Sequence, residues 1–501
     1  MSADIKKRIA VGAGWMVFMR LGDRLIGLVS MAVLARLLLP ADFGLVGYAI
    51  VLLAILEIFA QLGVENALIH DQKAPRESYD TAWTMNICKG LVLSVGLLIA
   101  AKPAAVFFEA PQVEAVIYVL AILPFVSGIE NIGTVDFRKD LAFHKDFIFN
   151  FLTRFCGAIV TICLAFILRD HWALVIGMIL RALLRVVLSY VMSEFRPRLT
   201  LSRFSEIFNF SKWIMLQNLL HGFNERLPAL VIGRLSGPQA LAFFNIGFEI
   251  ANLASTELAA PIRRALFPGF AKMNQDRAQL ADSFRWALSI IVLVGLPIPM
   301  GIAATADYIV PTLLGWNWLD TVPIIQILCF QGAVVILGTN SHLVYLALGK
   351  PAITAWLSGL RLLVLVPCCI YWVGIYGAVG AGLALVASAV VVRFTDYAIV
   401  LPMLGMRISD FAAQIWRPLT GVLAMNAVVR LLHTWLEQSA LQPYLLPKLA
   451  ICVVAGAVTY LAVVIGLWLI TGAREGAESY ILGMIRKFLV ARRLLPNRDP
   501  A

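Results

Sequence analysis

Basic residues recur in otherwise apolar stretches of the first third of the chain. Arg20 and Arg24 stand four residues apart, with Asp23 between them. Residues at i and i+4 share one face of a helix, so the two guanidinium groups would project together. A charged side chain at the bilayer centre costs about 2.5–3.5 kcal/mol on insertion scales, so it needs a partner or a water-filled cavity. Paired guanidinium groups in such a cavity would suit the oxygens of a phosphate.

Further cations lie in the apolar stretches that follow. Lys89 and Arg154 stand alone, whereas Arg181 and Arg185 repeat the four-residue spacing. A cavity lined by these residues would attract an anion. In the alternative interpretation, a structural ion-pair cluster is formed by Arg20, Asp23 and Arg24. Arg181 and Arg185 would then reach toward a membrane face. The candidate substrate-binding residues of this part are Arg20, Asp23, Arg24, Lys89 and Arg154.

Polar residues form stripes on two apolar segments of the second half. They recur at three- and four-residue spacing over residues 217–225 and 245–256. A polar stripe inside lipid usually faces protein or water, which favours a lined cavity over plain hydrogen bonding between helices. A single histidine such as His221 can also be an ordinary interhelical donor. The candidate binding residues here are His221, Glu225, Asn245 and Asn252.

Two carboxylates, Glu57 and Glu249, are candidates for coupling to an ion gradient. A carboxylate in the middle of a membrane can keep its proton while it is shielded from water and release it when a cavity opens. The alternative is a neutral hydrogen-bond donor with no role in transport.

The elements that would position these residues are membrane-spanning helices. The chain has 501 residues, is 60% hydrophobic and 14% charged, and has a mean hydropathy of +0.85. Soluble proteins average about 25% charged residues. Apolar runs of about 20 residues are typical of spanning helices, so we expect an all-α integral membrane protein with about fourteen of them. The predicted spans are 12–38, 43–67, 81–101, 113–133, 147–168, 172–192, 211–233, 240–262, 284–305, 321–346, 352–373, 376–400, 415–434 and 445–471.

An internal repeat organises the predicted spans. At an offset of 198 residues, Trp15, Arg36-Leu37 and Pro40 correspond to Trp213, Arg234-Leu235 and Pro238. Each copy contains about six spans, an even number, so both enter the membrane from the same side. Two parallel bundles with a cleft between them are typical of transporters. The predicted parts are a six-helix lobe (1–198), a second six-helix lobe (199–405), two additional helices (406–472) and a basic amphipathic cytoplasmic tail (473–501).

The basic residues also predict orientation. With both termini in the cytoplasm, cytoplasmic segments hold about 26 of the 41 Lys and Arg residues, and the opposite side holds roughly six. The formal net charge of +11 is therefore mainly a topology signal and not a sign of nucleic-acid binding.

Several enzyme classes lack support in the sequence. There is no Gly-x4-Gly-Lys-Ser/Thr phosphate loop, and the six histidines form no His/Cys cluster with metal-ligand spacing. The seven cysteines fall within predicted helices, which favours packing roles over disulfide bonds. The predicted outer loops are short, with no room for a large catalytic loop. We therefore expect no enzymatic activity, no metal and no cofactor.

Three stretches resemble a known family. They are residues 36–45 (Arg-Leu-Leu-Leu-Pro-Ala-Asp-Phe-Gly-Leu), 62–69 (Leu-Gly-Val-Glu-Asn-Ala-Leu-Ile) and 136–143 (Asp-Phe-Arg-Lys-Asp-Leu-Ala-Phe). This pattern is similar to the opening of bacterial polysaccharide-unit flippases, a branch of the multidrug/oligosaccharidyl-lipid/polysaccharide exporter superfamily. The resemblance is clearest over residues 12–155. One departure is Gln61, where many members are expected to have Asp or another polar residue.

The resemblance implies an inner-membrane flippase working by alternating access of two lobes. Its substrate would be an oligosaccharide linked through pyrophosphate to a polyprenol, moved from the cytoplasmic to the periplasmic leaflet for lipopolysaccharide O-antigen or exopolysaccharide synthesis. It also implies membrane lipids, a polysaccharide polymerase and chain-length machinery as partners and, in some relatives, coupling to an ion gradient. Relatives that flip the peptidoglycan precursor use first-span arginines near the pyrophosphate, and Arg20 and Arg24 fill comparable places.

Two other functions stay open at this point. A drug/cation antiporter of the same superfamily would favour a cavity rich in carboxylates and aromatic rings, whereas Arg and Lys dominate the first third of this chain. A membrane-integral glycosyl-transferring enzyme would need a larger outer loop, and sugar incorporation by the purified protein would reveal it.

Overall fold

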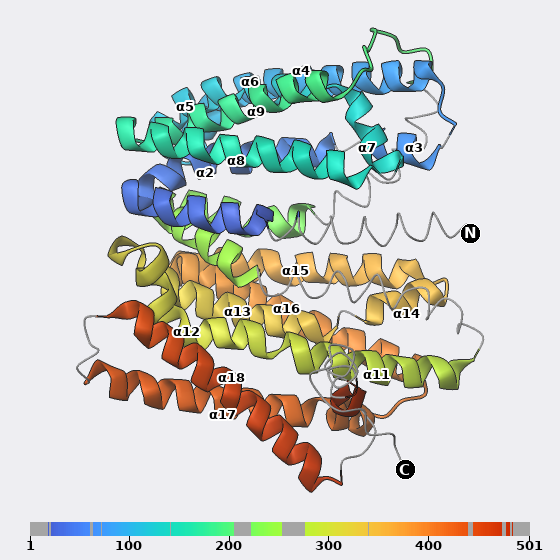
Figure 1. Ribbon diagram of the computed structural model, residues 1–501, viewed down its shortest axis with the longest axis vertical. Coiled ribbons are helices and arrows are strands. Elements are labelled where there is room, and N and C mark those ends of the chain that lie inside the picture. Colours follow the sequence, from blue (N-terminus) through green and yellow to red (C-terminus); the bar gives the residue numbers. More distant parts are fainter. Residues whose placement is uncertain are drawn as a thin grey trace, which may run out of the picture. The chain divides into compact units, whose positions relative to one another are not determined.

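The computed structural model contains only helices as regular elements within the part of the chain that it describes (Figure 1). The described residues are 19, 22–60, 64–71, 73–140, 142–204, 222–252, 276–338, 340–438, 444–472, 477–480 and 483. Among them, 11 helices are long and apolar enough to cross a membrane, or 12 if one bent pair forms a single span. The predicted all-helical membrane fold is confirmed, and the count of fourteen spans stays a prediction.

The chain forms two compact units, residues 1–245 and 246–501. The helix 222–252 contributes to both. This division follows the packing of residues and not the internal repeat of the sequence. The predicted lobes of 1–198 and 199–405 therefore remain a prediction. Unit 1 also contains helix 22–37, α2 (Pro40–Phe59), α3 (Val64–His70), α4 (Arg76–Phe107), α5 (Gln112–Leu120), α6 (Ile122–Gly128), η1 (Ile132–Val135), α7 (Asp136–Lys139), α8 (Phe143–Leu168) and α9 (Trp172–Met192). Unit 2 also contains α11 (Arg277–Gly295), α12 (Pro297–Leu313), η2 (Trp316–Trp318), α13 (Thr321–Leu337), α14 (Ser341–Ala347), α15 (Pro351–Tyr376), α16 (Ala378–Met403), α17 (Ile408–Glu437) and α18 (Leu445–Ile470).

Local residue chemistry sets several helix boundaries. Pro40 is the first residue of α2, where its fixed φ suits a helix start and its missing N–H is not needed. Gly377 separates α15 from α16 with a φ of 59°, a conformation that glycine adopts readily. Gly237, with a φ of 84°, falls between the predicted spans 211–233 and 240–262. The described helix 222–252 covers only parts of those two spans.

The core of unit 1 depends on close approach between helices. The hydroxyl of the fully buried Tyr48 donates to the Gly233 carbonyl at 3.0 Å, and its ring stacks on Phe108 at 4.3 Å between centroids. A Cβ added at Gly44 would lie 1.8 Å from the Pro238 carbonyl oxygen. Small residues at such contacts are typical of helices that associate within a membrane.

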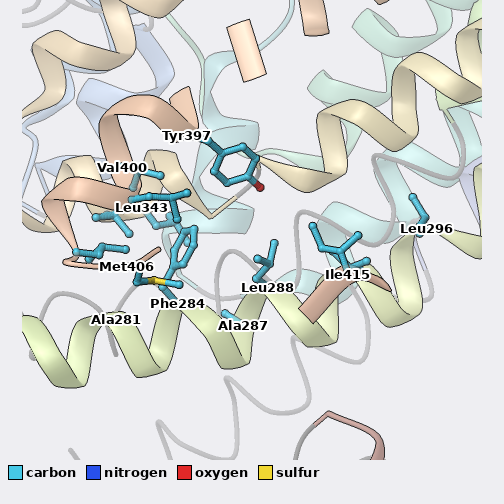
Figure 2. Close-up of a cluster of buried hydrophobic side chains, with 14 of the residues drawn as sticks. Ala281, Phe284, Ala287, Leu288, Leu296, Leu343, Tyr397, Val400, Met406 and Ile415 are labelled. Atoms are coloured by element: carbon cyan, nitrogen blue, oxygen red, sulfur yellow. The ribbon is translucent and has the colours of Figure 1, made fainter. Parts of the chain in front are cut away.

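A second core lies in unit 2, where α11 packs against α12, α13 and α17. Phe284 and Leu288 of α11 are fully buried and belong to one cluster with Tyr397 and Val400 of α16 (Figure 2). The cluster also includes Tyr460 and Val464 of α18, so the last two long helices share the core of unit 2.

Candidate functional site

The structure brings two predicted site residues of unit 1 together. Arg154 of α8 and Asp23 of helix 22–37 form an ion pair, with 3.8 Å between Nε and Oδ1. Both side chains are about one-third exposed, at 32% and 31%. Gly27, one helical turn after Asp23, leaves room for the arginine, because a Cβ there would lie 2.7 Å from Arg154 Nη2. The pair is therefore built into the packing of α8 against helix 22–37.

Arg181 of α9 extends this group. α8 and α9 run side by side (Figure 1). Gly157 of α8 accommodates the arginine stem, since a Cβ there would lie 2.8 Å from Arg181 Cγ. Arg181 interacts electrostatically with both Arg154 and Asp23. Because arginine stays protonated in proteins, two guanidinium groups around one carboxylate leave a net positive charge.

Arg185, one turn after Arg181, is held by other groups. Its Nε lies 2.8 Å from Glu130 Oε2, its Nη1 donates to Asn150 Oδ1 at 3.1 Å, and its guanidinium sits 4.6 Å from the centre of the Phe149 ring. The sequence did not place either arginine among the candidate binding residues, and one interpretation had both reaching toward a membrane face. The signal that could have identified Arg181 was its four-residue spacing from Arg185, the same as that of Arg20 and Arg24.

The remaining candidates of the first third are placed differently. Arg24 follows Asp23 on helix 22–37 and is half-buried, whereas Arg20 lies outside the described residues. Lys89 of α4 interacts with Glu57 of α2, and Arg226 interacts with the same carboxylate. Glu57 is exposed. These three residues form a second charged group in unit 1, and it contains one of the two candidate ion-coupling carboxylates.

The polar stripes of the second half are described in part. Asn245 lies against α2, where a Cβ at Gly47 would be 3.3 Å from its Nδ2 atom. Asn252 is half-buried, and both Glu225 and Glu249 are exposed. His221 lies outside the described residues.

Unit 2 contains an apolar groove of about 710 Å³ between α12, α17 and α18. Its walls include Ile298 and Ile302 of α12, Met425 of α17 and Leu461 of α18. Glu478 is the single charged residue in its described lining, and it accepts a 2.7 Å hydrogen bond from Arg417. A carbon-lined groove can hold a hydrocarbon chain through the hydrophobic effect. Sequence reasoning did not find this groove, because apolar groove residues and apolar lipid-facing residues look alike in a sequence.

Comparison with known proteins places the chain in a family. A family model described as "Polysaccharide biosynthesis protein" matches residues 33–323, more than half of the chain. The lipopolysaccharide biosynthesis protein WzxC of Escherichia coli (strain K12) is 22% identical over 420 residues, which cover 83% of this chain and 85% of WzxC. The succinoglycan biosynthesis transport protein ExoT of Rhizobium meliloti (strain 1021) is 23% identical over 361 residues, or 71% of this chain and 72% of ExoT.

A solved structure shows the same fold. The lipid II flippase MurJ, in an inward closed conformation, aligns with a TM-score of 0.71 at 13% sequence identity, over 91% of this chain and 99% of MurJ. The family model that matches residues 33–323 covers more than half of the chain, so the chain belongs to the family of polysaccharide biosynthesis proteins.

Proposed function

We propose that this protein is a flippase for a lipid-linked oligosaccharide in the bacterial inner membrane. It would move a repeat unit carried on polyprenyl pyrophosphate from the cytoplasmic to the periplasmic leaflet, for lipopolysaccharide O-antigen or exopolysaccharide synthesis. The observation that carries the proposal is the group of Asp23, Arg154 and Arg181 on apolar helices of a polysaccharide biosynthesis family member.

The charges of this group suit a pyrophosphate. Asp23 neutralises one of the two guanidinium charges, and a phosphate oxygen would neutralise the other. Arg24 adjoins Asp23 in the sequence, and Arg20 precedes Arg24 by four positions. Both would add positive charge for the pyrophosphate. Since an uncompensated charge inside a membrane is costly, a net positive group there favours an anionic ligand. Glu57 balances only one of the two cations beside it, Lys89 and Arg226, so this second group would also attract an anion. The polar residues His221, Glu225, Asn245 and Asn252 would hydrogen-bond sugar hydroxyls.

The groove of unit 2 supports a substrate with a lipid part. Its carbon walls lie between the last two long helices and α12, where an acyl or polyprenyl chain would lose contact with neighbouring lipids and gain contact with protein. The two additional helices, 406–472, would thus border the path of the lipid tail. The similar proteins named above include a transport protein for succinoglycan biosynthesis and a lipid II flippase, which is consistent with such a substrate.

The rest of the proposal rests on the sequence. Two six-helix lobes, 1–198 and 199–405, would alternate access, both termini would lie in the cytoplasm, and a polymerase with chain-length machinery would receive the product. Glu57 and Glu249 would couple the cycle to an ion gradient. The transmembrane potential supplies about 2.3 kcal/mol per elementary charge per 100 mV, so charge movement alone could also drive the cycle.

Substitution of the arginines tests the proposal. In a strain lacking this protein, plasmid copies with Arg24→Ala, Arg154→Ala or Arg181→Ala should restore surface polysaccharide to less than about a tenth of the wild-type level, since removing a charge-assisted contact of roughly 1.5–3 kcal/mol lowers binding about 10- to 100-fold. Lys145→Ala is the matched control, because this exposed lysine is also on α8 but outside the group. Membrane levels of each variant are compared by immunoblot.

The antiporter alternative makes the opposite forecast. Export would then be unaffected by all three arginine substitutions, and the wild-type protein would raise the tolerance of the cells to cationic drugs. That pair of results would reject the flippase proposal.

A further inference from the structure

A polar cluster outside the candidate site joins two parts of unit 1 that are far apart in sequence. Asp42 belongs to the first turn of α2, and Asp170 and His171 form the turn between α8 and α9. One donor atom from each residue lies within 4.8 Å of the other two. The side chains are partly exposed, at 19%, 45% and 17% respectively, so water and ions can reach them.

The backbone aims these three residues at one another. The Leu39 N–H donates to Asp42 Oδ2 at 2.9 Å, which leaves Oδ1 facing His171. Arg169 ends α8 in a left-handed conformation, with a φ of 50°, and turns the chain toward α2. Beneath the cluster, Leu34, Leu38, Ala165 and Ala173 form an apolar core that holds the helix 22–37 end against the α8–α9 turn.

Both carboxylates converge on a single nitrogen of the imidazole ring. His171 Nδ1 is in hydrogen-bond contact with Asp170 Oδ1 and lies 3.8 Å from Asp42 Oδ1. One ring nitrogen carries at most one hydrogen, so it can donate to only one of them. The second carboxylate, beyond hydrogen-bond distance, adds negative charge that this ring nitrogen cannot satisfy. Asp170 Oδ1 also accepts the His171 backbone N–H at 2.5 Å, which holds this carboxylate beside the ring. A cation shared by all three atoms would neutralise the charge of the two carboxylates and bind the lone pair of a neutral imidazole.

We propose that Asp42, Asp170 and His171 bind a zinc-class divalent cation that links the first turn of α2 to the α8–α9 turn. Zn²⁺ takes histidine nitrogen and carboxylate oxygen at about 2.0–2.2 Å and accepts water as a fourth ligand. Ligand atoms around such an ion are roughly 3.5 Å apart, which small rotations of these side chains would reach. Mg²⁺ and Ca²⁺ prefer all-oxygen sites, so the histidine favours zinc over them.

Zinc binding by the purified full-length protein tests the proposal. Protein in detergent is stripped with a chelator, dialysed and titrated with zinc chloride by calorimetry, and its thermal unfolding is followed with and without zinc. We expect one ion per chain and a rise in the unfolding temperature, because a ligand bound only to the folded state stabilises it. Magnesium chloride at the same concentration should produce neither effect.

Two pairs of variants assign the site. Asp42→Asn should lose the zinc-dependent shift of the unfolding temperature. Asp410→Asn is its matched control and should keep the shift. Asp410 Oδ2 accepts the Arg407 N–H at 2.9 Å at the start of α17, just as Asp42 Oδ2 accepts the Leu39 N–H at 2.9 Å at the start of α2. His171→Gln should weaken zinc binding at least about tenfold, since even the groups that hydrogen-bond to metal ligands are worth about 10–100-fold in affinity. His144→Gln removes an exposed histidine of α8 and should have no effect.

The outcomes separate clearly. Loss of the zinc effect in Asp42→Asn and His171→Gln, with both controls unchanged, supports the site. Absence of a zinc effect in the wild-type protein overturns the proposal without any variant, and so does zinc binding that persists in both ligand variants. A variant that elutes as aggregate is replaced by Asp170→Asn, for which the same expectation holds.

Discussion

Gly27 is the residue on which the position of Arg154 depends most directly. Its missing side chain leaves the space that the Arg154 guanidinium occupies beside Asp23. The atom nearest to a Cβ at position 27 is Arg154 Nη2, at the far end of a flexible side chain. A methyl group at position 27 would therefore displace the guanidinium without disturbing the backbone. Position 27 can therefore change the charge geometry of the site while leaving the fold intact.

We expect Gly27→Ala to lower polysaccharide export several-fold while the unfolding temperature stays unchanged or rises. Alanine is favoured over glycine inside helices by about 1 kcal/mol, which offsets the cost of moving Arg154. Gly466→Ala on α18 is the matched control, since a Cβ at Gly466 meets nothing within 4 Å. Export equal to that of the control would mean that the position of Arg154 does not matter for transport.

At the scale of elements, α13 and α14 are joined around a buried ion pair. Arg393 of α16 lies in the space beside Gly338, where a Cβ would come within 1.0 Å of its Nη1 atom. The same Nη1 is 2.6 Å from Asp396 Oδ2, and the Tyr345 hydroxyl donates to Asp396 Oδ1 at 2.6 Å. The Asp396 side chain is only 3% exposed. Tyr345 of α14 is thus linked to α16 through the Asp396 carboxylate, and the end of α13 at Gly338 lies against the arginine of the same pair.

Arg393→Met should destabilise the protein by about 3–5 kcal/mol, because it leaves the buried Asp396 carboxylate with the Tyr345 hydroxyl but without the positive charge that balances it. The double variant Arg393→Met/Asp396→Leu should recover much of that loss, since removing both charges of a buried pair is often nearly neutral. Thermal unfolding in detergent measures both. Equal destabilisation by the single and the double variant would show that the charge is not the cause.

At the scale of the whole chain, the spans could be predicted well where apolar length decides them. The predicted span 172–192 coincides with α9, and the predicted span 445–471 differs from α18 by one residue. The predicted single span 113–133 is instead interrupted. Helix Gln112–Gly128 and Ile132–Lys139 meet at a 66° bend, where the buried Asn131 side chain accepts the Gly133 N–H at 2.9 Å. Hydropathy does not detect such a local cap.

The contacts of the site could be predicted less well than the spans. Asp23 and Arg154 meet although 131 positions separate them, and Glu130 and Arg185 are 55 apart. Periodicity identifies which face of a helix is polar, but the partner depends on which helices pack together. The same limit applies to His171 and Asp42, since no spacing rule connects a helix start with a turn that lies 129 positions later.

The groove of unit 2 gives a prediction for the complete transport cycle. Ala457 of α18 lines the groove, whereas its neighbour Val458 is 59% exposed and does not. Ala457→Trp would fill part of the 710 Å³ with an indole ring and compete with a lipid chain for the same walls. We expect it to reduce export at least several-fold, while Val458→Trp leaves export unchanged.

The two tryptophan variants should unfold at similar temperatures, because each side chain is added to an apolar setting on the same helix. Radiolabelled polyprenyl pyrophosphate saccharide bound by each detergent-purified variant provides the direct measurement, and Ala457→Trp should retain less of it. If Ala457→Trp exported and bound as much as Val458→Trp, the groove would hold only ordinary membrane lipid. The arginines of unit 1 would then account for substrate recognition without a contribution from α17 and α18.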